Sequence, residues 1–203
     1  MAAEQTFTAI SLMPSIPRPL RAQCPPERIV LTGFMGSGKS TIGPLLAAEL
    51  GWTFLDLDVE VEQRSGQTVP EIFAKRGEAA FRQEETAALV SILGHPHCVI
   101  ALGGGAPETL ANRLLLEQTP ATAVIYLAAS FATLAGRCAQ QAKVPAATLR
   151  PLFADPVTAE MRFAARHPLY LRLAHVSIDT DNLTPAASVA AVLQAISAKR
   201  SRA

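Results

Sequence analysis

The chain has 203 residues, of which 49% are hydrophobic and 17% are charged, a balance that excludes a disordered chain and allows one sizeable core. Its net charge of +1 argues against a nucleic-acid-binding surface, and no apolar run is long enough to span a membrane. The three cysteines, Cys24, Cys98 and Cys138, lack the spacing of a metal site or a disulfide framework. That pattern is typical of a reducing cytoplasm.

The first 26 residues differ from the rest, with prolines at positions 14, 17, 19, 25 and 26. Prolines at this density block regular structure, so we predict a disordered tail over 1–26. A transit peptide is the alternative, because the tail is poor in acidic residues. We see no linker in the remainder and predict a single domain over 27–200.

The stretch 33–40 reads Gly-Phe-Met-Gly-Ser-Gly-Lys-Ser, the spacing of a phosphate-binding loop. The apolar run 28–32 predicts a buried strand before it, and 39–50 predicts a helix after it. Glycines let backbone amides face an anion, and the helix adds the positive end of its dipole. Lys39 supplies a charge for the β- and γ-phosphates of a nucleotide, and Ser40 supplies a hydroxyl for Mg²⁺.

Residues 52–58 predict a second strand that ends in two carboxylates, Asp56 and Asp58. Side chains alternate along a strand, so both carboxylates are expected on the same side. Two acids at the end of a strand near a phosphate-binding loop suggest magnesium binding and proton transfer. The alternatives are a solvated strand end or the cap of a following helix.

Residues 59–76 are polar and helical in pattern, with breaks at Gly66 and Pro70 and a helix start at Thr68. A longer helix with an apolar stripe is predicted over 78–93. Arg82 lies beside that stripe and can reach an anion. The alternative is a surface arginine that pairs with Glu78 or Glu85.

A third strand is predicted over 98–102 and runs directly into Gly103, Gly104 and Gly105. Three glycines after a strand allow backbone amides to approach a ligand, and a plain turn is the alternative. A helix over 107–118 and a fourth strand over 123–127 follow.

The remainder predicts a helix over 131–142, an irregular segment, a helix over 157–166, a strand over 176–178 and a helix over 184–198. The irregular segment carries prolines and Arg150, which indicates a lid over about 138–156, with a surface loop as the alternative.

Strands that alternate with helices predict a three-layer α/β/α fold with a five-stranded, mainly parallel sheet. Ser40, Asp58 and Gly104 all follow strands, so they are expected at one sheet edge.

The motifs together resemble the shikimate kinase family, over residues 28 to about 195. The marks of that resemblance are the loop 33–40, the Asp56-Leu57-Asp58 pair, Glu71-Ile72-Phe73 before Gly77-Glu78 and Phe81-Arg82, the triple glycine 103–105, Arg150-Pro151-Leu152, and Arg166 before Leu169-Tyr170. Six such marks in this order are specific. The resemblance implies a P-loop NTPase fold like that of nucleoside monophosphate kinases, with a mobile lid, in an enzyme of the pathway to aromatic amino acids.

The resemblance also implies a reaction, the ATP- and Mg²⁺-dependent phosphorylation of the 3-hydroxyl of shikimate, and a role for each site residue. The ATP-binding residues would be Gly36, Ser37, Gly38, Lys39, Ser40, Thr41, Arg137 and Arg150, with Ser40 and, through water, Asp56 at the magnesium ion. The residues that bind shikimate would be Asp58, Arg82, Gly103, Gly104, Gly105 and Arg166, with Arg82 and Arg166 as a clamp on its carboxylate. Catalysis would fall to Asp58, Lys39 and Arg150.

Two features differ from the usual pattern of the family: the segment between Arg137 and Arg150 is longer and poor in charge, and the loop 179–184 lacks a basic residue near the adenine. Two other functions stay open from the sequence. One is another small-molecule kinase of the same build, such as a gluconate kinase. The other is a nucleotide-binding regulator without turnover. We expect shikimate and ATP as the partners of a monomer.

Overall fold

One parallel sheet of five strands organises the computed structural model, which describes residues 25–141 and 155–200. The strand order is β2-β3-β1-β4-β5, and every neighbouring pair is parallel. The strands are β1 (Arg28–Thr32), β2 (Thr53–Asp56), β3 (Cys98–Ala101), β4 (Thr122–Ala128) and β5 (Val176–Asp179). The helices are α1 (Lys39–Leu50), α2 (Leu57–Ser65), α3 (Val69–Leu93), the short 3₁₀ helix η1 (Ala106–Glu108), α4 (Leu110–Gln118), α5 (Phe131–Gln141), α6 (Pro156–Leu173) and α7 (Pro185–Arg200).

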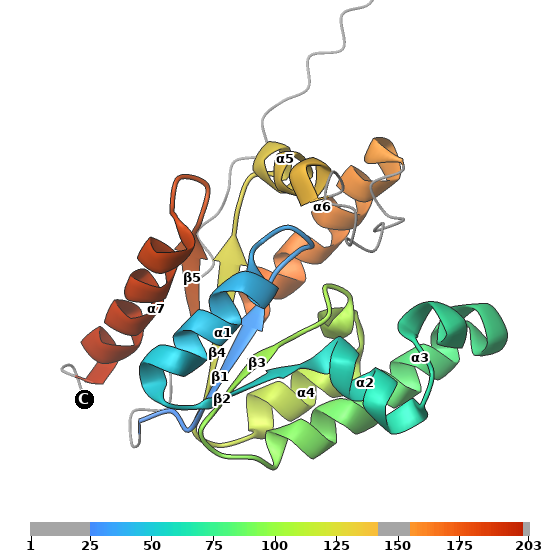
Figure 1. Ribbon diagram of the computed structural model, residues 1–203, viewed down its shortest axis with the longest axis horizontal. Helices are drawn as coiled ribbons and strands as arrows, with labels where there is room; N and C mark the ends of the chain where they lie inside the picture. The colour runs from blue at the N-terminus through green and yellow to red at the C-terminus, as the bar shows by residue number, and fades with distance from the viewer. Residues whose placement is uncertain (1–24, 142–154, 201–203) are drawn as a thin grey trace, which may run out of the picture.

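Helices cover both faces of the sheet (Figure 1). On one face, Leu46 of α1 and Val192 of α7 pack with Ile29 and Leu31 of β1. On the other face, α2, α3, α4 and the end of α6 share a core with the strands; its largest fully buried members are Leu57, Ile72, Leu89, Ile92, Ile100 and Leu102. The predicted three-layer α/β/α architecture is therefore confirmed.

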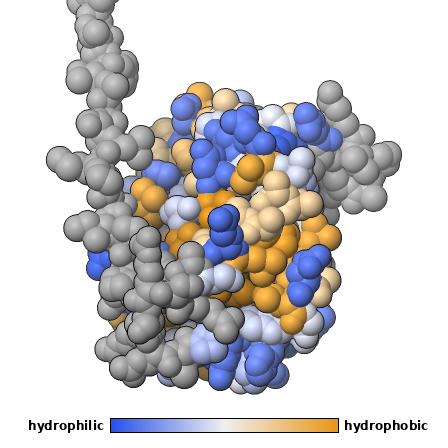
Figure 2. Space-filling model, turned by 90° about the vertical axis from the view of Figure 1, so that its left-hand side faces the viewer, coloured by the Kyte–Doolittle hydropathy of each residue, from blue (hydrophilic) through white to orange (hydrophobic). Residues whose placement is uncertain are grey.

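The helix α7 is apolar on its outer side as well. Ala186, Ala187 and Ala190 occupy exposed positions there. The helix α7 lies on the left-hand side of the molecule in Figure 1, and this side faces the viewer in Figure 2, where apolar side chains gather on it. This face is on the opposite side of the sheet from α2 and α3.

The strand that was predicted over 52–58 is shorter, and this changes the place of Asp58. The strand β2 ends at Asp56, whose side chain accepts a hydrogen bond from the backbone N–H of Asp58 and caps α2. Asp58 lies in the first turn of that helix. The prediction that both carboxylates belong to one strand was wrong, because the chain turns into a helix between them, and the alternative that the strand end caps a following helix is confirmed.

Several helix boundaries also differ from the sequence-based expectation. The helix α3 continues across a kink at Gly77, where φ is 79° and ψ is 174°. A 3₁₀ turn precedes α4, so the helix predicted from residue 107 begins at Leu110. The helix α6 continues past Pro168 to Leu173, because buried Tyr170 and Leu173 anchor its last turns.

None of the helices within 25–141 and 155–200 combines the length and apolar composition of a membrane span. Residues 1–24 of the predicted tail and most of the predicted lid, including Arg150, fall outside the described residues.

Candidate active site

The phosphate-binding loop joins β1 to α1 and packs closely against α5. Gly36 and Gly38 have φ angles of 79° and 96°, a region that favours glycine. A Cβ at Gly36 would lie 2.8 Å from the carbonyl oxygen of Leu134 in α5. Both the backbone conformation and the space beside α5 therefore require glycine at this position.

Lys39 lies across this loop. Its Nζ donates hydrogen bonds to the carbonyl oxygens of Gly33 at 2.7 Å and Phe34 at 3.0 Å. Ser40 and Thr41 are exposed in the first turn of α1, where a helix presents unpaired amides and the positive end of its dipole. An ammonium group, two hydroxyls and helix amides are thus gathered within three residues, a set suited to phosphate.

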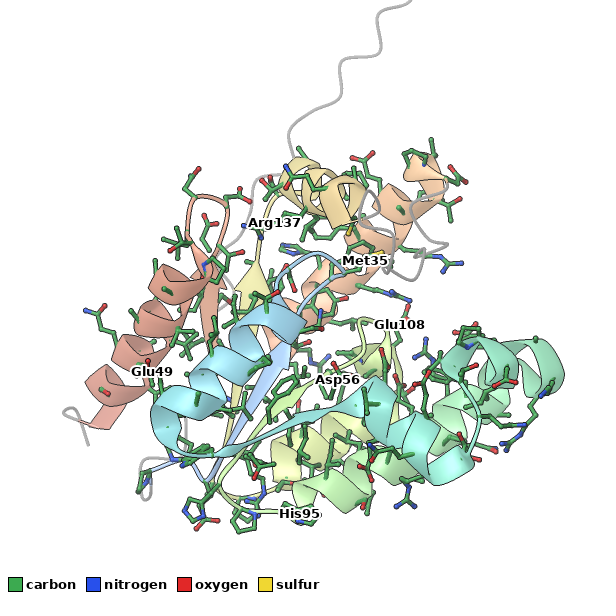
Figure 3. The ribbon with its side chains drawn as sticks, viewed as in Figure 1. Met35, Glu49, Asp56, His95, Glu108 and Arg137 are labelled. Atoms are coloured by element: carbon green, nitrogen blue, oxygen red, sulfur yellow. The ribbon has the colours of Figure 1, made fainter. Side chains whose placement is uncertain are left out.

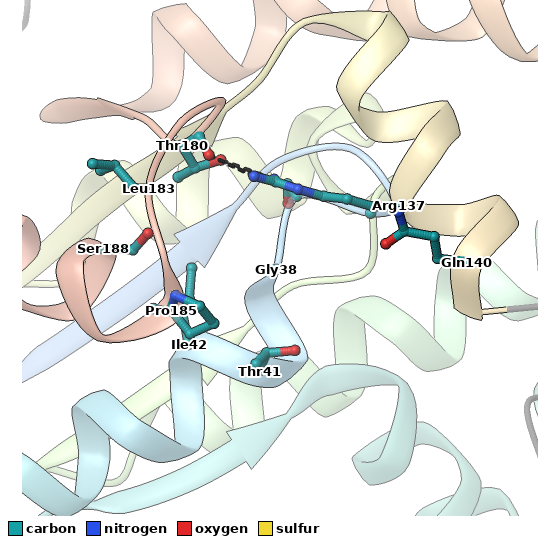
Figure 4. Close-up of a pocket in the computed structure, with 11 residues that line it drawn as sticks. Gly38, Thr41, Ile42, Arg137, Gln140, Thr180, Leu183, Pro185 and Ser188 are labelled. Atoms are coloured by element: carbon teal, nitrogen blue, oxygen red, sulfur yellow. Dashed lines mark hydrogen bonds between the residues drawn. The ribbon is translucent and has the colours of Figure 1, made fainter. Parts of the chain in front are cut away.

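A pocket of about 330 Å³ extends from the loop toward α7 (Figure 4). Arg137 of α5 lies across it and donates hydrogen bonds to the backbone carbonyl and hydroxyl oxygens of Thr180. Asp181 accepts a hydrogen bond from the backbone N–H of Ser130 at 2.8 Å and so ties the loop after β5 to the start of α5. The pocket is lined by Gly36, Ser37, Gly38, Thr41, Ile42, Arg137, Gln140, Thr180, Leu183, Pro185 and Ser188.

The two predicted carboxylates lie at the same sheet edge, although they belong to different elements. Asp56 is half-buried at the end of β2, and Asp58 is exposed at the start of α2. Figure 3 shows Asp56 and Glu108 at this edge, while His95 marks the opposite end of the sheet. A Cβ at Gly103 would lie 2.8 Å from Asp58 Oδ1, so Asp58 rests against the triple glycine.

Two arginines from distant helices meet at one carboxylate. Oε2 of Glu108 lies 2.8 Å from Arg166 Nη2 and 3.5 Å from Arg82 Nη2. Arg82 also pairs through Nη1 with Glu85 at 3.0 Å and through Nη2 with Glu78 at 3.1 Å, the two partners that the surface alternative named. The structure therefore brings together the two arginines that the family resemblance pairs, and a carboxylate already lies between them.

Arg166 is nearly inaccessible to solvent. The residue is 8% exposed and forms part of the buried polar set. Within the described residues its Nε has no hydrogen-bond partner. A guanidinium that retains an unused buried N–H can donate a hydrogen bond to one further anionic or polar group.

Glu85 is a site residue that the sequence did not single out. It is 1% exposed, and burial raises the pKa of its carboxyl to about 7, although Arg82 acts in the opposite direction. Asn112 Nδ2 lies 3.4 Å from Glu85 Oε2. The available signal was its position within the apolar stripe of α3, where a charged residue needs a buried partner.

The triple glycine makes room for these side chains. A Cβ at Gly105 would lie 2.5 Å from Arg82 Nη2, and one at Gly103 would lie 3.2 Å from Glu85 Oε1. The carbonyl oxygen of Gly104 accepts a hydrogen bond from the Tyr170 hydroxyl at 2.6 Å. The lack of side chains at these glycines therefore allows charged groups to pack directly against the backbone.

The phosphate-binding loop follows the central strand of a parallel sheet, and an arginine pair that binds a carboxylate lies at the same edge. These features together define a P-loop kinase of small molecules. The family model described as shikimate kinase matches residues 35–197. The chain belongs to the shikimate kinase family.

Individual relatives support this membership. A shikimate kinase from Pseudomonas syringae pv. tomato is 41% identical over 171 residues, which are 82% of this chain and 94% of the relative. One from Chlorobium luteolum is 50% identical over 109 residues, which are 54% of this chain and 53% of the relative.

Solved structures agree with the fold. Shikimate kinase from Acinetobacter baumannii in complex with shikimate superposes with a TM-score of 0.75 at 34% identity, and the match covers 86% of this chain and 95% of that one. A gluconokinase from Sinorhizobium meliloti superposes with a TM-score of 0.55 at 18% identity, and the match covers 89% of this chain and 97% of that one. At that identity the gluconokinase supports the fold alone.

Proposed function

We propose that this protein transfers the γ-phosphoryl group of ATP to the 3-hydroxyl of shikimate, giving shikimate 3-phosphate and ADP. The observation that carries the proposal is the convergence of Arg82 and Arg166 on a single carboxylate oxygen, at the sheet edge that holds the phosphate-binding loop. Two guanidinium groups suit a planar carboxylate because their donors match both of its oxygens. Membership of the family makes shikimate the acid that fits this arrangement.

The nucleotide would bind along the loop and in the pocket beside it. Backbone amides of 36–41 and the Lys39 ammonium would hold the phosphates. The base would lie in the pocket crossed by Arg137, whose lining lacks a basic residue from the loop 179–184. The hydrogen bonds from Arg137 to Thr180 support a role for this arginine in shaping the base site.

A magnesium ion fits these residues only together with the nucleotide. The described residues contain no group of three or more histidine, cysteine or acidic side chains that could hold a metal by themselves. The Ser40 hydroxyl and, through water, the Asp56 carboxylate would complete a shell whose other ligands are phosphate oxygens and water. The ion would neutralise charge on the transferred group.

Asp58 would orient the 3-hydroxyl of shikimate and accept its proton. Its exposed carboxylate rests against Gly103, on the same side of the triple glycine as Glu85. Phosphoryl transfer depends mainly on alignment and charge neutralisation, so one positioned carboxylate is sufficient. Arg150, which lies outside the described residues, stays a prediction as the lid arginine that reaches the transferring phosphate, as do the lid itself and the tail.

A coupled assay of ADP release tests the proposal. We expect turnover with shikimate, ATP and Mg²⁺, and none with gluconate in place of shikimate. Activity with gluconate alone would favour the sugar-acid kinase, and nucleotide binding without turnover of either acid would favour a regulator. A monomer with shikimate and ATP as its only partners, located in the cytoplasm, is the proposed setting, and the cysteine pattern supports that location.

A further inference from the structure

Glu108 occupies the position between the two arginines. It is the last residue of η1, three positions after the triple glycine. One of its oxygens, Oε2, approaches Nη2 of both Arg82 and Arg166, at 3.5 Å and 2.8 Å. A substrate carboxylate held by the same two guanidiniums needs the volume that this oxygen fills.

The backbone at Glu108 is held in place, and its side chain is not enclosed. Arg113 Nη1 donates hydrogen bonds to the carbonyl oxygens of Pro107 and Glu108, and Asn112 Nδ2 donates to that of Ala106. The side chain of Glu108 is 40% exposed. The carboxylate can therefore rotate into solvent while η1 stays where it is, and no refolding is needed to open the site.

We propose that Glu108 is an internal competitor for the carboxylate clamp, a residue that sets affinity and selectivity for the acidic substrate. The inference rests on the proposed function, since it takes Arg82 and Arg166 as the groups that bind shikimate. Glu108 pairs with both arginines in the free protein and leaves when shikimate binds. A weak anion with no contacts beyond its charge does not displace it, whereas an acid that also uses its hydroxyls does.

The size of the effect follows from competition. When a site is closed for most of the time, the apparent dissociation constant rises by the ratio of the closed to the open population. A half-exposed charge-assisted pair corresponds to a ratio of roughly 3 to 10. Removal of the competing charge is expected to tighten shikimate binding by that factor.

The variant Glu108→Gln tests this, because it keeps the size of the side chain and removes its charge. We expect a dissociation constant for shikimate, measured by calorimetry without nucleotide, that is about 3- to 10-fold lower than in the wild type. Glu78→Gln is the matched control: it removes an equal charge from Nη2 of Arg82, but among the ion pairs of the described residues Glu78 contacts Arg82 alone, whereas Glu108 contacts both arginines. The affinity of the Glu78→Gln variant for shikimate is expected to stay the same or fall.

A second readout does not depend on shikimate. Phenylglyoxal modifies accessible arginines, and mass spectrometry of the Arg166 peptide gives the rate in the free protein. Among the ion pairs of the described residues, Glu108 is the carboxylate that contacts Arg166. Glu108→Gln should raise that rate severalfold, and Glu78→Gln should not.

The outcomes separate the two proposals. A wild type that binds shikimate, together with unchanged affinity and unchanged Arg166 modification in Glu108→Gln, overturns the role of Glu108 and leaves the proposed function standing. A wild type that neither binds nor phosphorylates shikimate overturns the proposed function. In that case the modification rate alone decides whether Glu108 covers the arginine pair.

Discussion

Replacement of Glu85 by glutamine should remove a pH dependence from the stability of the protein. Burial raises the pKa of this carboxyl from an ordinary value of 4.5 to about 7 in the folded state. The folded protein therefore holds this proton more tightly than the unfolded chain. The resulting stabilisation is fully present below pH 4.5 and is lost as the pH rises through 7.

The difference between these pKa values corresponds to roughly 3 kcal/mol in full, most of which is lost between pH 5 and pH 8. Glu85→Gln keeps the shape and the hydrogen-bonding capacity toward Asn112 and does not titrate. Urea unfolding of both proteins at pH 5, 6, 7 and 8 measures the change. All other groups titrate in both proteins, so the difference between their unfolding free energies isolates Glu85.

That difference should shift in favour of the variant by roughly 2 to 3 kcal/mol from pH 5 to pH 8. Two stability curves that run parallel across this range would refute the reasoning. Such a result would mean that the ion pair with Arg82 balances the cost of burying the charge, so that Glu85 stays ionised.

Three further predictions concern the proposed reaction. Asp58→Asn should lower kcat by about 10²- to 10⁴-fold in the coupled assay and leave the ATP dissociation constant in place, since the carboxylate acts on the hydroxyl; near-normal turnover would contradict this role. Arg82→Ala and Arg166→Ala should each raise the KM for shikimate by about 10- to 100-fold through loss of charge-assisted hydrogen bonds, and unchanged KM values in both would undo the clamp. Gly105→Ala should raise the KM for shikimate but not that for ATP, because its Cβ would lie 2.5 Å from Arg82 Nη2 and displace that guanidinium.

The parts of the fold that the sequence predicted best are those with strong local signals. The strand β1 and the helix α1 have the predicted bounds, because a buried apolar run, a glycine-rich loop and a terminal Gly51 leave little freedom. The positions of the other strands along the chain followed in the same way, with bounds that differ by one or two residues. Local sequence patterns were sufficient to predict the bounds of an element wherever the residues at its two ends favour a single backbone conformation.

Local signals failed where tertiary contacts decide. Proline normally ends a helix, yet Pro168 lies inside α6, since the burial of Tyr170 and Leu173 outweighs one lost hydrogen bond. We predicted Asp58 in a strand because an acidic residue shortly after a capping carboxylate gives the same local sequence pattern in a strand and in a helix. The meeting of Arg82 with Arg166 spans 84 positions, and no pattern along the chain encodes it; only the family resemblance paired them.

The presence of Glu108 in the clamp also explains how two guanidiniums can be kept together before substrate arrives. A buried charge without a partner costs several kcal/mol, and Arg166 is 8% exposed, with an Nε donor that has no partner among residues 25–141 and 155–200. An internal carboxylate removes most of that cost in the free protein. Binding of an acidic substrate then exchanges one carboxylate for another, so the charge around Arg82 and Arg166 stays nearly constant while Glu108 moves to water. The stability of the free protein and the affinity for substrate are therefore opposed at this residue, and a chain with an uncharged side chain here would gain affinity at the expense of stability.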